Sequence, residues 1–172
     1  MVSPASSEHS HRDQPWSDEA PEHGSIVLVT DNPVSHAIAE IAATLGRRSV
    51  VLPDEDVEES PLEWLTDHPL TERDALVLCA HDTPDLDALL HHAMEGRAGY
   101  VAMLASRSRA EQTFAALADE FSAETLERMH MPAGLNTGGK APGEMALSVV
   151  AEIVAWSYGR PGGPMRRDLG RA

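Results

Sequence analysis

The stretch LVTDNPVSHAIAEIAATLGRRSVVLPDED, residues 28–56, contains the pattern that decides the fold class. The stretch begins inside the apolar run IVLV, which covers residues 26–29. Such a run is typical of a parallel strand that is buried on both faces. Apolar residues at helical spacing follow, and Gly46 marks the end of this helix. The segment SVVLP at 49–53 then predicts a second strand. A strand, a helix and a strand in this order predict a right-handed crossover unit of a parallel sheet.

The same alternation continues along the rest of the chain. Further strands are predicted at 74–81 and 99–105, and a short fifth strand is a candidate at 129–132. A helical or irregular link is expected at 60–68, and helices are predicted at 83–96, 106–121, 122–129 and 142–159. This alternation predicts an α/β, Rossmann-like three-layer fold, with a mainly parallel sheet and helices on both faces. Ligands of such sheets bind beyond the carboxyl ends of the strands, where the strand order reverses.

The length of 172 residues suits one domain with a tail at each end. Residues 1–24 are rich in Ser, Pro, Glu and His and show no apolar periodicity, so we expect a disordered acidic tail. The Rossmann-like domain is expected over 25–160. Residues 161–172 are basic and rich in glycine, which predicts a flexible basic tail.

Acidic side chains dominate the chain, with 28 Asp and Glu against 13 Lys and Arg and a net charge of −15. This charge argues against nucleic acid and against an anionic membrane, because lysines and arginines supply most of the affinity for both. No apolar run is long enough to cross a membrane and no signal peptide opens the chain, so we expect a cytoplasmic protein. The single cysteine, Cys79, lies in the apolar run ALVLCA, which predicts a buried and inert thiol.

The first turn, at residues 30–33, lacks the glycines that let a backbone approach a pyrophosphate. Pro33 has no N–H, and Asn32 is placed to cap the helix, so few donors remain for a phosphate. Asp31 adds a negative charge beside any incoming anion. A self-capped turn is therefore favoured over an NAD site of the standard kind, and Asp31 and Asn32 are retained as candidate polar contacts to a ligand at this edge of the sheet. Asp54, after the second strand, stands where an acid of a dinucleotide site holds the ribose hydroxyls.

Two further loops end at the same edge of the predicted sheet. The third strand leads into His81 and Asp82, which are candidate polar contacts to a ligand, although Asp82 is equally placed to cap the next helix. The fourth strand leads into a helix start with Ser106, Arg107 and Arg109, which predicts an anion site because arginine offers forked donors. The alternative is that Ser106 caps the helix while the two arginines pair with nearby acids.

The longest loop, HMPAGLNTGGKAPGE at 130–144, precedes the last helix. Long glycine-rich loops in small domains are more often functional than not. Its candidate ligand contacts are His130, Gly134, Leu135, Gly138, Lys140 and Glu144. The chain shows no nucleophile with a neighbouring base and no cysteine or histidine spacing that suits zinc, so we predict no catalytic and no metal-binding residue.

Three segments, 75–94, 99–112 and 129–155, resemble the C-terminal Rossmann domain of the XdhC/CoxI proteins, which are accessory factors of molybdenum hydroxylases. The last segment follows the family pattern H-x-P-x-G-L-x-x-G-x-x-x-P-x-E-[IM]-A-L-S-[IV]-x-A-E-I. The residues that meet it are His130, Pro132, Gly134, Leu135, Gly138, Pro142, Glu144, Ala146, Leu147, Ser148, Ala151, Glu152 and Ile153. The family's glycine-rich G-A-G-H turn is replaced here by Thr30-Asp31-Asn32-Pro33, and its G-S-R-R turn by Ala105-Ser106-Arg107-Ser108.

The resemblance implies a non-catalytic accessory protein in the maturation of a molybdenum hydroxylase of the xanthine dehydrogenase or carbon monoxide dehydrogenase type. The ligands that it implies are the molybdenum cofactor (molybdopterin) or a nucleotide such as NAD(P) or FAD. The implied partners are the hydroxylase apoenzyme, a cofactor sulfurase or a second copy of the chain. The family's cysteine-bearing N-terminal domain is expected to be absent. Two alternatives stay open, namely an NAD(P)-dependent oxidoreductase and a Rossmann-like interaction module without a ligand.

Overall fold

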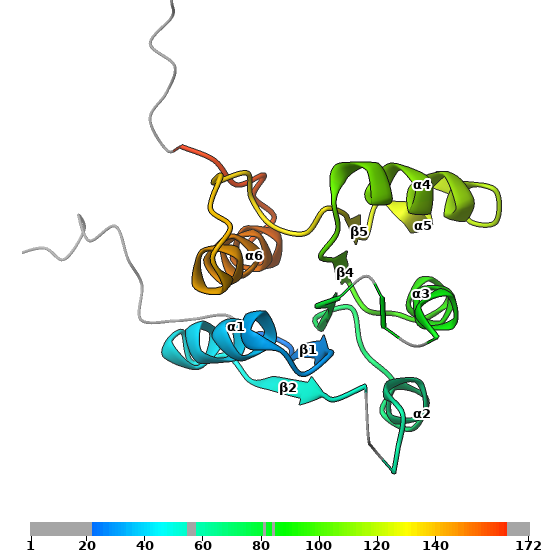
Figure 1. Ribbon diagram of the computed structural model, residues 1–172, viewed down its shortest axis with the longest axis horizontal. Helices are drawn as coiled ribbons and strands as arrows, with labels where there is room; N and C mark the ends of the chain where they lie inside the picture. The colour runs from blue at the N-terminus through cyan, green and yellow to red at the C-terminus, as the bar shows by residue number, and fades with distance from the viewer. Residues whose placement is uncertain (1–21, 55–57, 81, 84, 165–172) are drawn as a thin grey trace, which may run out of the picture.

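The computed structural model describes residues 22–54, 58–80, 82–83 and 85–164. Strands in these ranges form one parallel sheet in the order β2-β1-β3-β4-β5. The strands are β1 (Ile26–Val29), β2 (Ser49–Leu52), β3 (Ala75–Leu78), β4 (Tyr100–Met103) and β5 (Met129–His130). The helices are α1 (Pro33–Thr44), α2 (Pro61–Asp67), α3 (Leu86–Glu95), α4 (Arg107–Ala118), α5 (Ala123–Leu126) and α6 (Pro142–Ser157). Helices α1 and α6 lie side by side on one face of the sheet, and α2 and α3 lie on the other (Figure 1).

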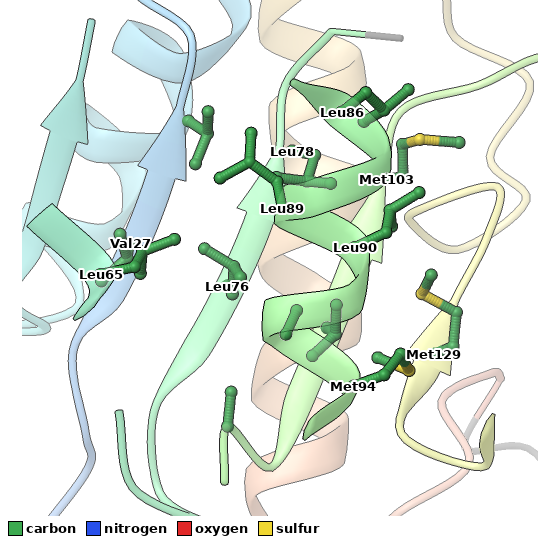
Figure 2. Close-up of a cluster of buried hydrophobic side chains, with 14 of the residues drawn as sticks. Val27, Leu65, Leu76, Leu78, Leu86, Leu89, Leu90, Met94, Met103 and Met129 are labelled. Carbon is green, nitrogen blue, oxygen red and sulfur yellow. The ribbon is translucent and has the colours of Figure 1, made fainter. Parts of the chain in front are cut away.

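The two faces of the sheet form two separate cores, because successive residues of a strand point to opposite faces. On one face, Leu76 and Leu78 of β3 pack with Leu89 and Leu90 of α3 (Figure 2). On the other face, Val77 and the neighbouring strands pack against apolar side chains of α1 and α6. Burial on both faces explains why these strands consist of unbroken apolar runs.

The strand order reverses between β1 and β3. Helix α1 leads from β1 to its neighbour β2 on one side, and α2 leads back across to β3 on the other side. Val29 at the end of β1 pairs with Leu78 at the end of β3, so the two carboxyl ends lie next to each other. This junction is the place where open parallel sheets bind their ligands.

The predicted Rossmann-like fold is confirmed, and several elements are shorter than the sequence predicts. Strand β3 ends at Leu78, whereas 74–81 was expected. Helix α3 begins only at Leu86, because Asp85 before it adopts the left-handed backbone conformation with φ of 57°. The helix expected at 122–129 is reduced to the four residues of α5.

The predicted tails fall mostly outside the described residues, which include only 22–24 and 161–164 from those segments. Within the described parts of the chain, His23 lies beside the domain, with its ring centroid 5.5 Å from that of Tyr158. No helix in the described ranges has the length and apolar character needed to cross a membrane.

Candidate functional site

A pocket of about 710 Å³ opens beyond the carboxyl ends of β3 and β4. Its walls come from the start of α1, the first half of α6, the ends of the two strands and the loop after β5. The predicted site residues among its described lining are Ser106, Arg107, Gly134, Leu135, Gly138 and Lys140. The structure thus brings the basic helix start and the glycine-rich loop together, although they lie far apart in the sequence.

The first turn is closed by its own side chains. The Asn32 side-chain oxygen accepts hydrogen bonds from the backbone N–H groups of Val34 (2.9 Å) and Ser35 (3.0 Å). The Asn32 amide nitrogen donates to the backbone oxygen of Cys79 at 3.0 Å, which ties the turn to the end of β3. Pro33 begins α1 and offers no N–H. The predicted self-capped turn is confirmed, and little donor capacity remains at this helix start.

A second set of contacts joins the residues that follow β1, β2 and β3. The Thr30 hydroxyl donates to the Asp54 carboxylate at 2.9 Å and lies 2.9 Å from the Thr83 hydroxyl. Thr83 is buried, and Thr30 has a positive φ of 84°. Neither threonine was among the residues predicted from the sequence. The signal that identifies Thr30 is a non-glycine residue directly after β1, where the backbone needs a positive φ.

The other predicted ligand contacts after β1 and β3 are not part of the described pocket lining. Asp31 pairs with the imidazole of His36 on the exposed side of α1, with 2.5 Å between the carboxylate oxygen and Nε2. Asp82 is exposed and is not part of the described pocket lining. His81 lies outside the described residues. A ligand role for Asp31, Asn32, Asp54 and Asp82 stays a prediction, and the geometry around the first three is taken up by contacts within the chain.

Helix α4 starts at the pocket with two arginines of different placement. The Ser106 hydroxyl accepts a hydrogen bond from the Arg109 backbone N–H at 3.2 Å and caps the helix. Arg107 lines the pocket, whereas Arg109 does not belong to its described lining. Among the described residues neither arginine forms an ion pair. Of the alternative reading, the Ser106 cap is therefore present, and ion pairs of the two arginines are absent among the described residues. An anion-binding role of Arg107 and Arg109 stays a prediction.

The loop after β5 is held in shape from inside. Gly134 has a φ of 96°, and a side-chain Cβ at this position would lie 2.5 Å from the Ser148 hydroxyl oxygen. The Glu144 carboxylate accepts hydrogen bonds from the backbone N–H groups of Lys140 (3.0 Å) and Ala141 (3.1 Å). Glu144 therefore orients the end of the loop and the start of α6, and it is not among the described lining residues. Lys140 at the end of this loop is one of the residues that line the pocket.

Glu152 of α6 joins the loop to the sheet. One of its oxygens accepts hydrogen bonds from the Tyr100 hydroxyl (2.6 Å) and the Gly134 backbone N–H (2.8 Å), and the other lies 3.5 Å from Nδ1 of His130. Burial opposes ionisation of Glu152, but the hydrogen bonds from His130, Tyr100 and Gly134 outweigh it and hold its pKa below the usual value. Burial and the Glu152 carboxylate in turn raise the pKa of Tyr100.

His130, a predicted ligand contact, belongs to this cluster and is absent from the described lining of the pocket. Its ring stacks on that of Tyr100, with 4.2 Å between the centroids. Glu152 is a residue whose role sequence reasoning missed, since a lone acid on a helix usually lies in solvent. Its position in the family pattern was the available signal.

Cys79 forms part of the pocket wall, directly beyond the end of β3 and not within the strand as the sequence suggested. Its side chain is buried, as predicted. Burial and the nearby Asp54 carboxylate raise the pKa of the thiol to about 12, so the thiol is protonated at neutral pH. Within the described residues, no three His, Cys, Asp or Glu side chains are grouped to hold a metal ion.

The model of the XdhC Rossmann domain matches residues 26–153 of the chain. The chain belongs to the XdhC Rossmann domain family. An Escherichia coli (strain K12) relative, the uncharacterised protein YqeB, is 35% identical over 95 residues, which are 55% of this chain and 17% of YqeB.

A solved structure from Bacillus halodurans, described as a xanthine dehydrogenase, superimposes with a TM-score of 0.66. It is 20% identical, and the match covers 80% of this chain and 44% of that one. At this identity the match shows the fold. The XdhC domain described here spans less than half the length of YqeB and of the Bacillus protein.

The XdhC family pattern near the end of the chain has a structural explanation in this domain. Gly134 permits both the positive φ and the close approach to α6, and Glu144 caps that helix. Glu152 accepts the N–H of Gly134 and holds the loop against Tyr100. These pattern residues shape the wall of the pocket, whereas the two cationic lining residues, Arg107 and Lys140, are not among the residues that the pattern specifies.

Proposed function

We propose that this XdhC domain binds a small anionic ligand in the pocket and acts as a non-catalytic accessory protein in the maturation of a molybdenum hydroxylase. The hydroxylase would be of the xanthine dehydrogenase or carbon monoxide dehydrogenase type, and the ligand would be the molybdenum cofactor or a nucleotide. The domain would hold the ligand in the cytoplasm, receive it from a cofactor sulfurase and deliver it to the apoenzyme. Membership of the XdhC family supports the accessory role.

The observation that carries the ligand proposal is the pair of cations at one concave site of an acidic chain. Arg107 and Lys140 line the same pocket, and neither forms an ion pair among the described residues. The chain as a whole has a net charge of −15, and the described lining of this pocket contains two cationic residues and no Asp or Glu. A guanidinium offers forked donors to a phosphate, and an ammonium adds a point charge.

The donor set at the pocket fits one part of the molybdenum cofactor. Arg107, Lys140 and the Ser106 hydroxyl suit a phosphate group, and glycines allow backbone N–H groups to approach it. The Cys79 thiol is buried and its pKa is raised, which disfavours the thiolate form that binds metals. The donor groups of the pocket therefore suit the phosphate of the pterin better than its molybdenum.

Binding measurements test this proposal with a matched pair of variants. We expect native mass spectrometry of the purified protein to detect a retained phosphate-bearing ligand, and calorimetry to detect binding of the molybdenum cofactor. Arg107→Ala should weaken binding at least tenfold, since one charge-assisted contact is worth about 1.5–3 kcal/mol. Arg109→Ala is the control, because this arginine starts the same helix but is not part of the described lining. Equal effects of the two variants would contradict the proposal.

A maturation assay separates the accessory role from the two alternatives. Coexpression of a molybdenum hydroxylase with the Arg107→Ala variant should yield less active hydroxylase than coexpression with wild type. Copurification of a hydroxylase or sulfurase without any small ligand would instead support an interaction module. Hydride transfer with a bound nicotinamide would support an oxidoreductase.

A further inference from the structure

The crevice of a Rossmann-like sheet has a half that holds a nucleoside. In dinucleotide sites an acid about 20 residues beyond the first turn accepts hydrogen bonds from the ribose hydroxyls. Asp54 occupies this place in the present chain, since it follows β2 and lies 24 positions after Thr30 in the sequence. The acid that a ribose would need is therefore present.

In this structure the Thr30 hydroxyl already forms a hydrogen bond to the Asp54 carboxylate. It donates to Asp54 at 2.9 Å, as a ribose hydroxyl would, and lies 2.9 Å from the Thr83 hydroxyl. The three side chains belong to the loops that follow three neighbouring strands, β1, β2 and β3. Their contacts bridge the space over β1 in which a nucleoside would lie.

The backbone conformation of Thr30 is one that a threonine adopts only when other contacts hold it there. Its φ of 84° falls in the left-handed region, which a β-branched residue adopts only under strain and which glycine adopts freely. Strained residues persist where surrounding contacts determine their conformation, and they cluster at ligand sites. At Thr30 those contacts are the two side-chain hydroxyl and carboxylate partners.

We propose that Thr30 is a selectivity residue whose hydroxyl replaces a ribose hydroxyl at Asp54 and closes the nucleoside half of the crevice. The ligand of the neighbouring pocket is then a compact anion without a nucleoside at β1 and β2, such as a phosphate-bearing pterin. This inference rests on the proposed function, because it selects among the ligand classes named there. Asn32 and Pro33 support it by removing the backbone donors that a pyrophosphate would use.

Binding of ADP, measured by ligand-observed NMR on the full chain, tests the role of the Thr30 side chain. Thr30→Gly removes the hydroxyl and suits the positive φ, so it should bind ADP at least tenfold more tightly than wild type. Thr30→Ser is the matched control, since it keeps a hydroxyl for Asp54 and should bind ADP as weakly as wild type. The gain should disappear with 2′,3′-dideoxy-ADP and in the double variant Thr30→Gly with Asp54→Asn.

Three results would overturn the inference. They are ADP binding by wild type that depends on Asp54, absence of any gain in a folded Thr30→Gly protein, and a gain that persists with the dideoxy nucleotide. Thermal unfolding of each variant establishes that it is folded. The proposed function is tested separately, because Thr30→Gly should leave binding of the molybdenum cofactor sensitive to Arg107→Ala. If Arg107→Ala in the chain that keeps Thr30 leaves binding of the molybdenum cofactor unchanged, the proposed function is refuted. The role of Thr30 is then decided by the ADP measurements alone.

Discussion

The two halves of the crevice at the carboxyl edge of the sheet differ in what fills them. Over β1 and β2, side chains of the protein satisfy one another, with Thr30 bound to Asp54 and Asn32 bound to the start of α1. Over β3 and β4, a pocket of about 710 Å³ remains open, and Arg107 and Lys140 line it. The same backbone scaffold thus contains one half in which side chains bind one another and one half with two cationic residues that form no ion pair among the described residues. The contrast shows how a Rossmann-like sheet can keep its fold while the position of its ligand site changes.

The largest effect is expected when the wall of the open half is disturbed. Gly134→Ala places a Cβ 2.5 Å from the Ser148 hydroxyl oxygen at a positive φ of 96°. Strain and crowding together should lower the free energy of unfolding by about 3 kcal/mol. Urea denaturation measures this change.

Gly138→Ala is the control for this prediction, because Gly138 also has a positive φ, 82°, but a Cβ there would contact nothing within 4 Å. It should lower the free energy of unfolding by only about 1 kcal/mol, which is the cost of the backbone strain alone. If both variants are equally destabilised, the close approach of the loop to α6 is not a determinant of the pocket wall.

Glu152 provides the next largest effect. Glu152→Ala leaves the buried Tyr100 hydroxyl and the Gly134 N–H without their partner. Unsatisfied buried groups of this kind should lower the free energy of unfolding by about 2–3 kcal/mol. Calorimetric unfolding at neutral pH measures the loss, and a loss below that of an exposed control such as Glu124→Ala would contradict the role of Glu152.

The pH dependence of stability follows from the same cluster. The folded protein holds the pKa of Glu152 below its ordinary value of 4.5, so the stabilisation is present above pH 4.5 and is lost as the pH falls through the lower folded pKa. Tyr100 acts in the opposite direction, because its pKa is raised in the folded state from an ordinary value of 10. The stability it contributes is present below pH 10 and declines as the pH rises above this value. Urea midpoints between pH 3 and 11 should show both declines in wild type. Tyr100→Phe should reduce the alkaline decline, and the part that remains is expected from the buried Cys79 thiol, whose pKa is also raised.

The sequence predicts local contacts of the fold better than contacts between residues that are far apart in the chain. Buried parallel strands appear as unbroken apolar runs, and the cap by Asn32 joins residues only two and three positions apart, so both are visible in the sequence. The contact of Thr30 with Thr83 spans 53 positions and that of Tyr100 with Glu152 spans 52. Such pairs depend on strand order and helix placement, which the pattern of single residues does not contain.

The same limit applies to the basic side of the pocket. Arg107 and Arg109 have the same chemistry and are two positions apart, so the sequence treats them alike. Only Arg107 belongs to the described lining, because the α4 helix turns the two side chains in different directions. The glycine-rich loop, parts of which line the pocket, could be singled out from the sequence because loop length and composition are local properties. The inward role of Glu152 could not.

In the closed half, two Thr30 variants separate strain from hydrogen bonding. Thr30→Val removes the hydroxyl but keeps a β-branched residue at a φ of 84°. It should lower the free energy of unfolding by about 1–2 kcal/mol, because Asp54 and Thr83 lose a partner. Thr30→Gly loses the same contacts but relieves the backbone strain, so its net change should be smaller by about 1 kcal/mol. Urea denaturation of both variants in one buffer gives the comparison. A glycine variant that is less stable than the valine variant would show that the backbone at this position is not strained.

The smallest effect on stability is expected at Arg107, the residue that we propose to bind the ligand. Arg107 is exposed and forms no ion pair among the described residues, so Arg107→Ala should change the free energy of unfolding of the ligand-free protein by less than about 0.5 kcal/mol. A ligand that binds only the folded state raises the wild-type melting temperature and should raise that of the variant much less. Differential scanning calorimetry with and without the molybdenum cofactor measures both quantities. A large change in the free energy of unfolding of the ligand-free protein would mean that Arg107 supports the fold. The side chains at the pocket would then bind one another, as Thr30 and Asp54 do in the other half.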